Sequence, residues 1–195
     1  MRPRFHVPDL DPTAARVAVP DEEAEHLVRV LRLSAGAEVE VFDGHGGLWH
    51  AEVIETGKRS AWVRPLEPVA AAPEITIPIS LVISVLKADK MDDVVRDAVM
   101  LGARSIYPIV SERSEISLST VEKSQRVARW QRIAVSSAKQ CGRAVVPVVE
   151  AAQTWPAYLA VPSSDVRLIC VEPTAYPAEP PANSVGPPFM GGPTE

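Results

Sequence analysis

The chain has 195 residues, which gives room for one medium-sized domain or two small ones around a real hydrophobic core. Its composition, 46% hydrophobic and 23% charged, is that of an ordinary globular protein. No apolar run approaches the roughly 20 residues of a membrane span, and residues 1–20 lack a signal-peptide core. Two cysteines without a CxxC spacing exclude a disulfide framework. These features make the cytoplasm the default location.

The net charge is −5, and its distribution along the chain is more informative than its sum. From Lys87 to Arg143 there are eleven Lys and Arg against seven Asp and Glu, a local net charge of +4 that leaves −9 for the rest. A basic middle in an acidic protein fits contact with a polyanion. A solvated helix face gives the same count, so both interpretations stay open here.

Residues 1–70 have the pattern of a small β-rich domain. Short stretches in which apolar and polar residues alternate, as in strands, are found at 16–19, 39–42, 48–54 and 61–66. The glycine-rich loop at 43–47 predicts a hairpin, because glycine adopts the positive φ that tight turns need. Asp21 is a natural cap for a helix with an acidic first turn. One helix among short strands indicates a small barrel.

Residues 67–78 are rich in Pro and Ala and predict a linker. The continuous apolar run Ile79–Leu86 is typical of a strand buried on both faces. A helix over 92–101 ends at Gly102, and a second strand follows at 105–110. Strand, helix and strand in this order predict a right-handed crossover between parallel strands.

The longest predicted helix covers Val121–Cys141, with Trp130 on its inward stripe and a row of basic residues on its outer side. Strands at 145–149 and 166–171 follow it. The segment 173–195 contains seven prolines and no apolar periodicity, which indicates an unstructured tail. The second half of the chain is therefore an α/β unit with a parallel sheet.

Polar side chains follow the predicted strands of this unit. Lys87 and Lys90 come after the first strand, and Arg113 comes after the second. Gln140 and Arg143 end the long helix, and open parallel sheets bind ligands at the carboxyl ends of their strands. We therefore expect these side chains to face one cleft, although a solvated lysine, a strand-end arginine or a helix-capping Arg143 would give the same sequence.

The four histidines do not form a metal-binding pattern. His26 has no second histidine four residues later, and no cysteine lies near any of them in the sequence. Cys141 has no neighbouring base that would activate a thiol, so we expect it in the core. The sequence predicts no metal site.

Two segments carry a resemblance to a known family. They are HLVRVLRLSAGAEVEVFDGHGGLWHAEV and KADKMDDVV…LGARSIYPIVSERS…RWQRIAVSSAKQCGRAVVP. Together they resemble the RsmE family, whose members methylate N3 of a uridine in 16S ribosomal RNA with S-adenosylmethionine. The resemblance covers residues 1 to about 172. It is specific because two independent segments agree in order and spacing.

The resemblance implies an α/β fold in which a PUA-like β-barrel (1–70) precedes a SPOUT methyltransferase domain (74–172) with a trefoil knot. Family members continue for tens of residues, through two loops that hold the methyl donor. Here Gly186–Gly192 only faintly echoes the first loop, and the second is absent. We therefore expect a SPOUT domain that is incomplete at its C-terminus. Truncation, a frameshift and a decayed paralogue all stay open.

The resemblance also implies partners and roles. The partners are 16S ribosomal RNA in the small ribosomal subunit and a second copy of the chain, and no metal is needed because S-adenosylmethionine is already activated. Arg113 is the candidate catalytic residue, which would stabilise a uracil anion. Val171 and Glu172 are candidates for binding the methyl donor. The candidate RNA-binding residues are Arg2, Arg4, Arg29, Arg32, Lys87, Lys90, Arg113, Gln140 and Arg143.

Two alternatives remain at this point. A non-catalytic RNA-binding protein would keep the barrel and the basic helix without a donor site, and it predicts salt-sensitive RNA binding without donor affinity. A plain α/β protein with a solvated basic helix predicts no RNA binding.

Overall fold

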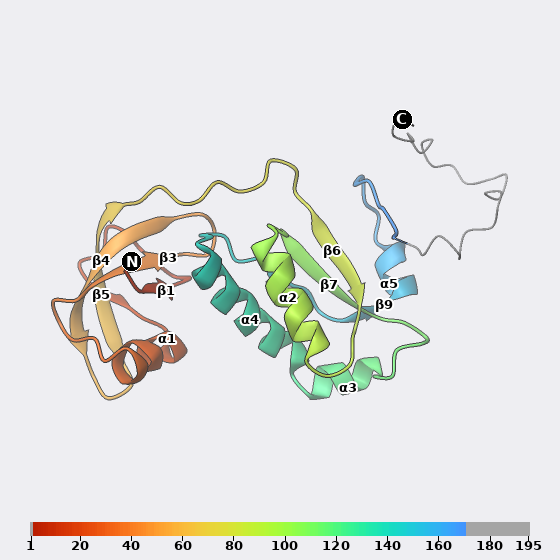
Figure 1. Cartoon of the computed structure of the whole chain (residues 1–195), viewed down its shortest axis with the longest axis horizontal. Helices are drawn as coiled ribbons and strands as arrows, with labels where there is room; N and C mark the ends of the chain where they lie inside the picture. The colour runs from red at the N-terminus through yellow and green to blue at the C-terminus, as the bar shows by residue number, and fades with distance from the viewer. Residues whose placement is uncertain (1, 171–195) are drawn as a thin grey trace, which may run out of the picture. The chain divides into compact units, whose positions relative to one another are not determined.

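The alternating stretches of the N-terminal half form a five-stranded sheet in a computed structural model, which describes residues 2–170 (Figure 1). Its order is β1-β3-β4-β5-β2, with β1 parallel to β3 and the other pairs antiparallel. The elements are β1 (Arg4–His6), β2 (Val17–Ala18), α1 (Asp21–Glu25), the π-helix η1 (His26–Val30), β3 (Glu38–Phe42), β4 (Leu48–Thr56) and β5 (Ala61–Pro68). The predicted strands of this half are confirmed.

The inward side chains of this sheet alternate with outward ones, as the sequence pattern requires. Val39, Val53 and Val63 are fully buried and pack with Leu27 in one apolar cluster. The predicted hairpin is also present between β3 and β4. Gly44 has φ +82° there, which favours glycine, and a Cβ on it would lie 2.7 Å from Nε2 of His6, so the His6 ring would have to shift.

The second half is the predicted α/β unit. Its parallel sheet has the order β6-β7-β8, and β9 also pairs with β7. The elements are β6 (Ser80–Ser84), α2 (Lys90–Met100), β7 (Ser105–Val110), α3 (Leu118–Lys123), α4 (Arg126–Cys141), β8 (Val148–Val149), β9 (Gln153–Thr154) and α5 (Trp155–Ala160). Residues 2–161 belong to one compact unit, to which residues 162–170 do not belong.

Helices α2 and α4 bury their apolar stripes against this sheet. Met91 and Val95 of α2, Trp130 and Ala134 of α4 and Ile106 of β7 are all buried in one cluster. Figure 1 shows α2 and α4 side by side. The predicted parallel pairing of the strands on either side of α2 and the inward position of Trp130 are therefore confirmed.

The long helix predicted over 121–141 is in fact two helices. Gln125 adopts φ 51°, in the left-handed region, between the end of α3 and the start of α4. The Ser124 hydroxyl donates to the Thr120 carbonyl at 2.6 Å, a side-chain bond that competes with helix continuation. Hydrophobic periodicity does not reveal such a break, because both helices keep the same buried stripe.

Two predicted strands differ from the structure. β6 is half-exposed rather than buried on both faces, because among the described strands only β7 pairs with it. Residues 166–170 form no strand, and Val166, Leu168 and Ile169 are 81%, 89% and 73% exposed. An apolar run forms a strand where a neighbouring strand pairs with it, and no described strand pairs with residues 166–170.

The predicted strand at 145–149 is shortened to β8. Val145 instead forms isolated bridges with Gly44 and His45 of the barrel hairpin. The expected tail at 173–195, the faint donor loop and any knot segment lie outside the described residues.

Candidate nucleic-acid interface

The carboxyl ends of β6 and β7 carry two loops, 85–89 and 111–117, at one edge of the parallel sheet. The strands are in parallel register, and the Val85 amide donates to the Ile109 carbonyl at 2.8 Å. Across the loops, Lys87 Nζ lies 2.9 Å from a carboxylate oxygen of Glu115. The fold thus places Lys87 beside the loop of Arg113, at the edge where open parallel sheets bind ligands.

The loop of Arg113 is a tight turn. The Ser114 hydroxyl accepts the Ser111 amide at 2.9 Å, which fixes the turn and leaves Arg113 exposed at its tip. Neither Arg113 nor Lys90, on the first turn of α2, has an ion-pair partner among residues 2–170. At this edge Lys87 is neutralised by Glu115, whereas Arg113 and Lys90 are open to an external anion.

Gln140 and Arg143 lie at the other edge of the sheet. Helix α4 connects the parallel strands β7 and β8, so its C-terminal end returns to their amino ends. Arg143 Nη1 accordingly donates to the carbonyls of Val99 and Ala103, just before β7, at 2.8 and 3.1 Å. The expectation of one cleft shared with Arg113 is therefore wrong, because a crossover helix runs antiparallel to its strands.

Arg143 is enclosed within the protein. Its side chain is 9% exposed, and Nε and Nη2 donate to the two carboxylate oxygens of Glu74 at 3.0 and 2.5 Å. With both forks of the guanidinium bonded internally, Arg143 holds the linker residue Glu74 onto the connection between α2 and β7. This position differs from the expected RNA contact. Gln140 remains exposed.

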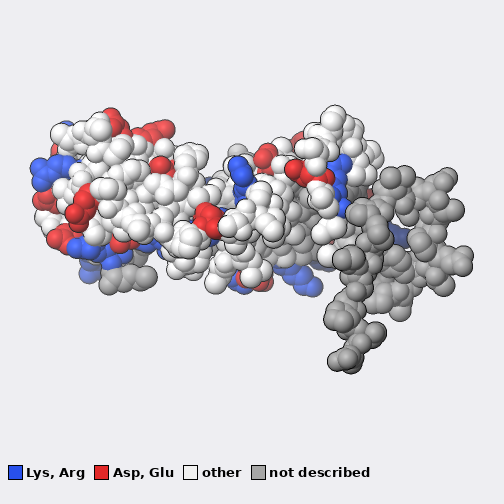
Figure 2. Space-filling model, turned by 90° about the horizontal axis from the view of Figure 1, so that it is seen from above, with Lys and Arg blue, Asp and Glu red and all other residues white. Residues whose placement is uncertain are grey.

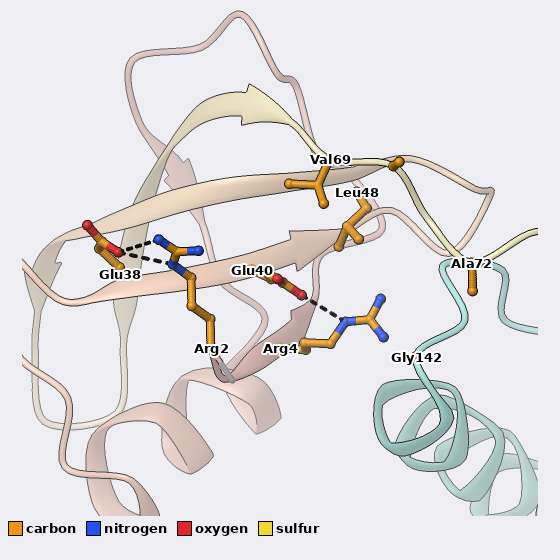
Figure 3. Close-up of a pocket in the computed structure, with 9 residues that line it drawn as sticks. Arg2, Arg4, Glu38, Glu40, Leu48, Val69, Ala72 and Gly142 are labelled. Atoms are coloured by element: carbon orange, nitrogen blue, oxygen red, sulfur yellow. Dashed lines mark hydrogen bonds and ion pairs between the residues drawn. The ribbon is translucent and has the colours of Figure 1, made fainter.

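Arg2 and Arg4 line a cavity of about 620 Å³ beside β1 and β3 (Figure 3). Arg2 Nη2 lies 2.7 Å from Glu38, and Arg4 Nε lies 3.4 Å from Glu40. Arg4 is 7% exposed in its side chain, and its guanidinium stacks over the Phe42 ring at 5.1 Å. The cavity is lined by Arg2, Arg4, Glu38, Glu40, Leu48, Val69, Ala70, Ala72 and Gly142.

Acidic side chains balance the arginines on this outer face of the sheet. The Arg2 guanidinium, by its hydrogen bond and its charge, holds the pKa of Glu38 below its usual value. His50 lies 3.0 Å from Glu67, and Glu52 lies beside Glu38 on the next strand. Arg2 and Arg4 are thus each paired with a carboxylate on a surface of mixed charge.

Arg29 and Arg32 lie at the end of η1. Arg29 Nη1 lies 2.6 Å from Glu25, one turn earlier, and Arg32 is exposed with φ 53°. The hydrogen bond from Arg29 and the charge of Arg59 hold the pKa of Glu25 below its usual value. Sequence reasoning missed Arg59, because thirty residues separate it from Arg29. On the face drawn in Figure 2, basic and acidic side chains are intermingled over the barrel.

A second hollow, of about 560 Å³, lies between α1 and the C-terminal half of α4. Lys139 Nζ lies 2.7 Å from Glu23 there, and both side chains are largely buried. His6, which lines the same hollow, packs its ring against Phe42 at 5.1 Å. Burial lowers the pKa of His6 below 6.5, against the opposing charges of Glu23 and Asp43.

The lowered pKa of His6 predicts a pH dependence of stability. Because the folded state disfavours the protonated ring, the contribution of His6 is complete above the unfolded pKa near 6.5. It is lost as the pH falls through the lower folded pKa. Urea unfolding from pH 7.5 to about 5 should therefore show wild type losing stability relative to His6→Gln. If the free energy of unfolding of the wild type, relative to that of His6→Gln, stayed constant or rose on acidification, the expected sign would be wrong.

Among residues 2–170 no three His, Cys, Asp or Glu side chains are arranged to hold a metal ion. No helix in that part of the chain is long and apolar enough to cross a membrane.

Comparison with known proteins agrees with this architecture. The model of the RNA methyltransferase domain matches residues 73–185, and that of the RNA methyltransferase PUA domain matches residues 19–66. The ribosomal RNA small subunit methyltransferase E of Synechocystis is 32% identical over 141 residues, which are 72% of this chain and 45% of that protein. That of Bacillus subtilis is 25% identical over 70% of this chain and 53% of its own length. The chain spans about half the length of the curated relatives it matches.

Solved structures show the same likeness. A ribosomal RNA small subunit methyltransferase E from Neisseria gonorrhoeae, bound to S-adenosyl methionine, matches with a TM-score of 0.77 and 31% identity. The match covers 84% of this chain and 67% of that one. A Legionella pneumophila methyltransferase matches at a TM-score of 0.73 and 22% identity, which supports the fold alone. From the two family models and these relatives, the chain belongs to the RsmE family of RNA methyltransferases, with a PUA domain before a SPOUT-type α/β domain.

Proposed function

We propose that this protein methylates N3 of a uridine in 16S ribosomal RNA, with S-adenosylmethionine as the methyl donor. The observation that carries the proposal is the match of the RNA methyltransferase domain to residues 73–185. It is supported by the relative from Neisseria gonorrhoeae, which has S-adenosyl methionine bound. The activity would place the protein in ribosome biogenesis, in the cytoplasm.

In this proposal the barrel at 1–70 holds the RNA and the domain at 74–172 carries the chemistry, in a homodimer on the small ribosomal subunit. The two family models divide the chain at a similar place, at residues 19–66 and 73–185. In this arrangement the barrel provides the affinity for structured RNA. The edge of the parallel sheet receives one base for the reaction. Such a division suits an enzyme that must take its base out of a stack.

S-adenosylmethionine, when bound, supplies an activated methyl group, so the protein has to position the uracil and stabilise its anion after loss of the N3 proton. The open edge after β6 and β7 suits this task, because exposed cations stand there at the ends of parallel strands. Val171 and Glu172, the residues expected to hold the donor, lie outside the described residues. At this edge of the sheet, Arg113 and Lys90 are exposed cations without an ion-pair partner among residues 2–170.

Arg113→Ala should lower methyl transfer about tenfold, since a hydrogen bond to a charged group contributes roughly 1.5 kcal/mol. The structural reason is that Arg113 sits at the tip of a turn fixed by Ser111 and Ser114, so its loss removes a donor without disturbing the fold. Single-turnover transfer of labelled methyl groups measures the effect. Arg96→Ala, on the exposed side of α2, is the matched control. Equal rates of methyl transfer for the Arg113 variant and the control would show that Arg113 has no role in the reaction.

Calorimetric titration of the 195-residue chain with S-adenosylmethionine tests the proposal. Binding in the micromolar range supports it for this polypeptide. A folded sample that binds RNA but no donor would favour the non-catalytic RNA-binding alternative.

A further inference from the structure

Two segments of the barrel, the end of η1 with the residues after it and the turn between β4 and β5, carry four exposed basic side chains. We call them the basic patch, and they are Arg29, Arg32, Lys58 and Arg59. Glu25 joins the two segments. One of its carboxylate oxygens lies 2.6 Å from Arg29 Nη1 and the other lies 3.0 Å from Arg59 Nη2. The fold thus places cations side by side that are thirty positions apart in the sequence.

The charge of the basic patch is poorly compensated. Two guanidinium groups with five N–H donors each share one carboxylate, so most of their donors remain unused. Arg29 and Arg59 have side chains 59% and 68% exposed. Arg32 and Lys58 are exposed and have no ion-pair partner among residues 2–170. The outer face around Arg2 differs, because each arginine there has a carboxylate of its own.

Apolar side chains accompany these cations. Val30 is 66% exposed and Leu31 is 39% exposed, and both stand between Arg29 and Arg32 in the chain. Exposed apolar groups next to guanidinium groups suit the sugar and base faces of a nucleic acid, while the cations bind its phosphates. This combination favours RNA over a simple anion.

The backbone around the basic patch is unusual. His26–Val30 is a π-helix, a rare conformation that is frequent at functional sites. Arg32 has φ 53°, which a non-glycine residue adopts at a cost of about 1 kcal/mol or more. Both irregularities fall in the segment that carries Arg29 and Arg32, whose side chains are exposed.

We propose that the basic patch is the main RNA-backbone site of the barrel, with Arg59 and Lys58 acting together with Arg29 and Arg32. Arg2 and Arg4 do not take part, since carboxylates and Phe42 occupy them. The inference rests on the proposed function, because it assumes that RNA is the ligand of the barrel. It adds the surface that contacts the RNA and the side chains that do so.

The test is binding of the chain to a fluorescent transcript of small-subunit ribosomal RNA, measured from 50 mM to 500 mM salt. Each lost phosphate contact reduces the slope of log K against log[salt] by about 0.7 to 0.9. The double variant Arg29→Ala/Arg59→Ala should therefore lose about 1.5 from this slope and bind roughly 20-fold more weakly at 100 mM salt. Both residues are exposed, so the melting temperature of the variant should stay within about 2 °C of that of the wild type.

Arg96→Ala on α2 is the control for loss of an exposed arginine away from the basic patch, and Arg2→Ala probes the other face of the barrel. The expected result is a loss confined to the double variant. If the double variant bound RNA as tightly as the wild type, the proposal for the basic patch would be wrong, and the proposed function would remain. A larger loss from Arg2→Ala would also overturn it. No binding of RNA by the wild type, or preferred binding to phosphatidylserine vesicles, would overturn the proposed function as well.

Discussion

Replacing Trp130 with Ala should lower the free energy of unfolding by about 4 kcal/mol, because the variant loses a large buried ring and keeps a cavity. Trp130 is 2% exposed and lies where α2, α4 and the sheet meet. The free energy of unfolding of a folded domain is about 5–15 kcal/mol in total, so this loss is a large share of it. Urea unfolding followed by circular dichroism measures the change.

Trp155→Ala is the matched control for this prediction. Trp155 is half-buried at the start of α5, where its ring contacts Tyr158 with centroids 6.0 Å apart. Its removal should cost about 1 kcal/mol. Equal losses for the two tryptophans would show that the cluster around Trp130 is not the main core of the α/β unit.

Arg143→Ala should destabilise the protein by about 3 kcal/mol, since it removes the partner of two buried carbonyls and of a partly exposed carboxylate. The affected groups are Glu74, Val99 and Ala103. Glu74 is a third exposed, so water compensates part of its loss and keeps the effect at the lower end of the usual range for buried pairs. Denaturant unfolding again gives the value.

The control for Arg143 is Arg2→Ala, which removes an exposed pair with Glu38. Such surface pairs contribute below about 1 kcal/mol. Arg143→Lys tests the geometry, because an ammonium group cannot span both Glu74 oxygens and two carbonyls at once. We expect it to recover less than half of the loss. A fully stable Arg143→Ala variant that bound RNA poorly would instead return Arg143 to the RNA-binding residues.

The barrel was the part most accessible to sequence reasoning. Its strands at 39–42, 48–54 and 61–66 are local alternations, and the hairpin depends on glycines within one loop. These signals need no long-range information. The break at Gln125 was missed because it depends on the Ser124 hydroxyl and on backbone conformation, neither of which alters the apolar period.

The site was less predictable. Strand ends correctly placed Lys87 and Arg113 at one edge of the sheet, because parallel register follows from the order of the elements. The place of Arg143 depends on Glu74, which is 69 positions away, and no local pattern encodes that pair. The same holds for Arg29 and Arg59. Contacts distant in sequence decide which cations are bonded internally and which remain exposed without an internal partner.

The most direct test of the account is methyl transfer to small ribosomal subunits that lack the modification, with labelled S-adenosylmethionine as donor. Mass spectrometry of the digested RNA identifies the methylated nucleoside, and primer extension locates it, since a methyl on N3 blocks base pairing. We predict a single N3-methyluridine in 16S ribosomal RNA. A chain that binds the donor and leaves every uridine unmodified, or that methylates another atom, would contradict the account.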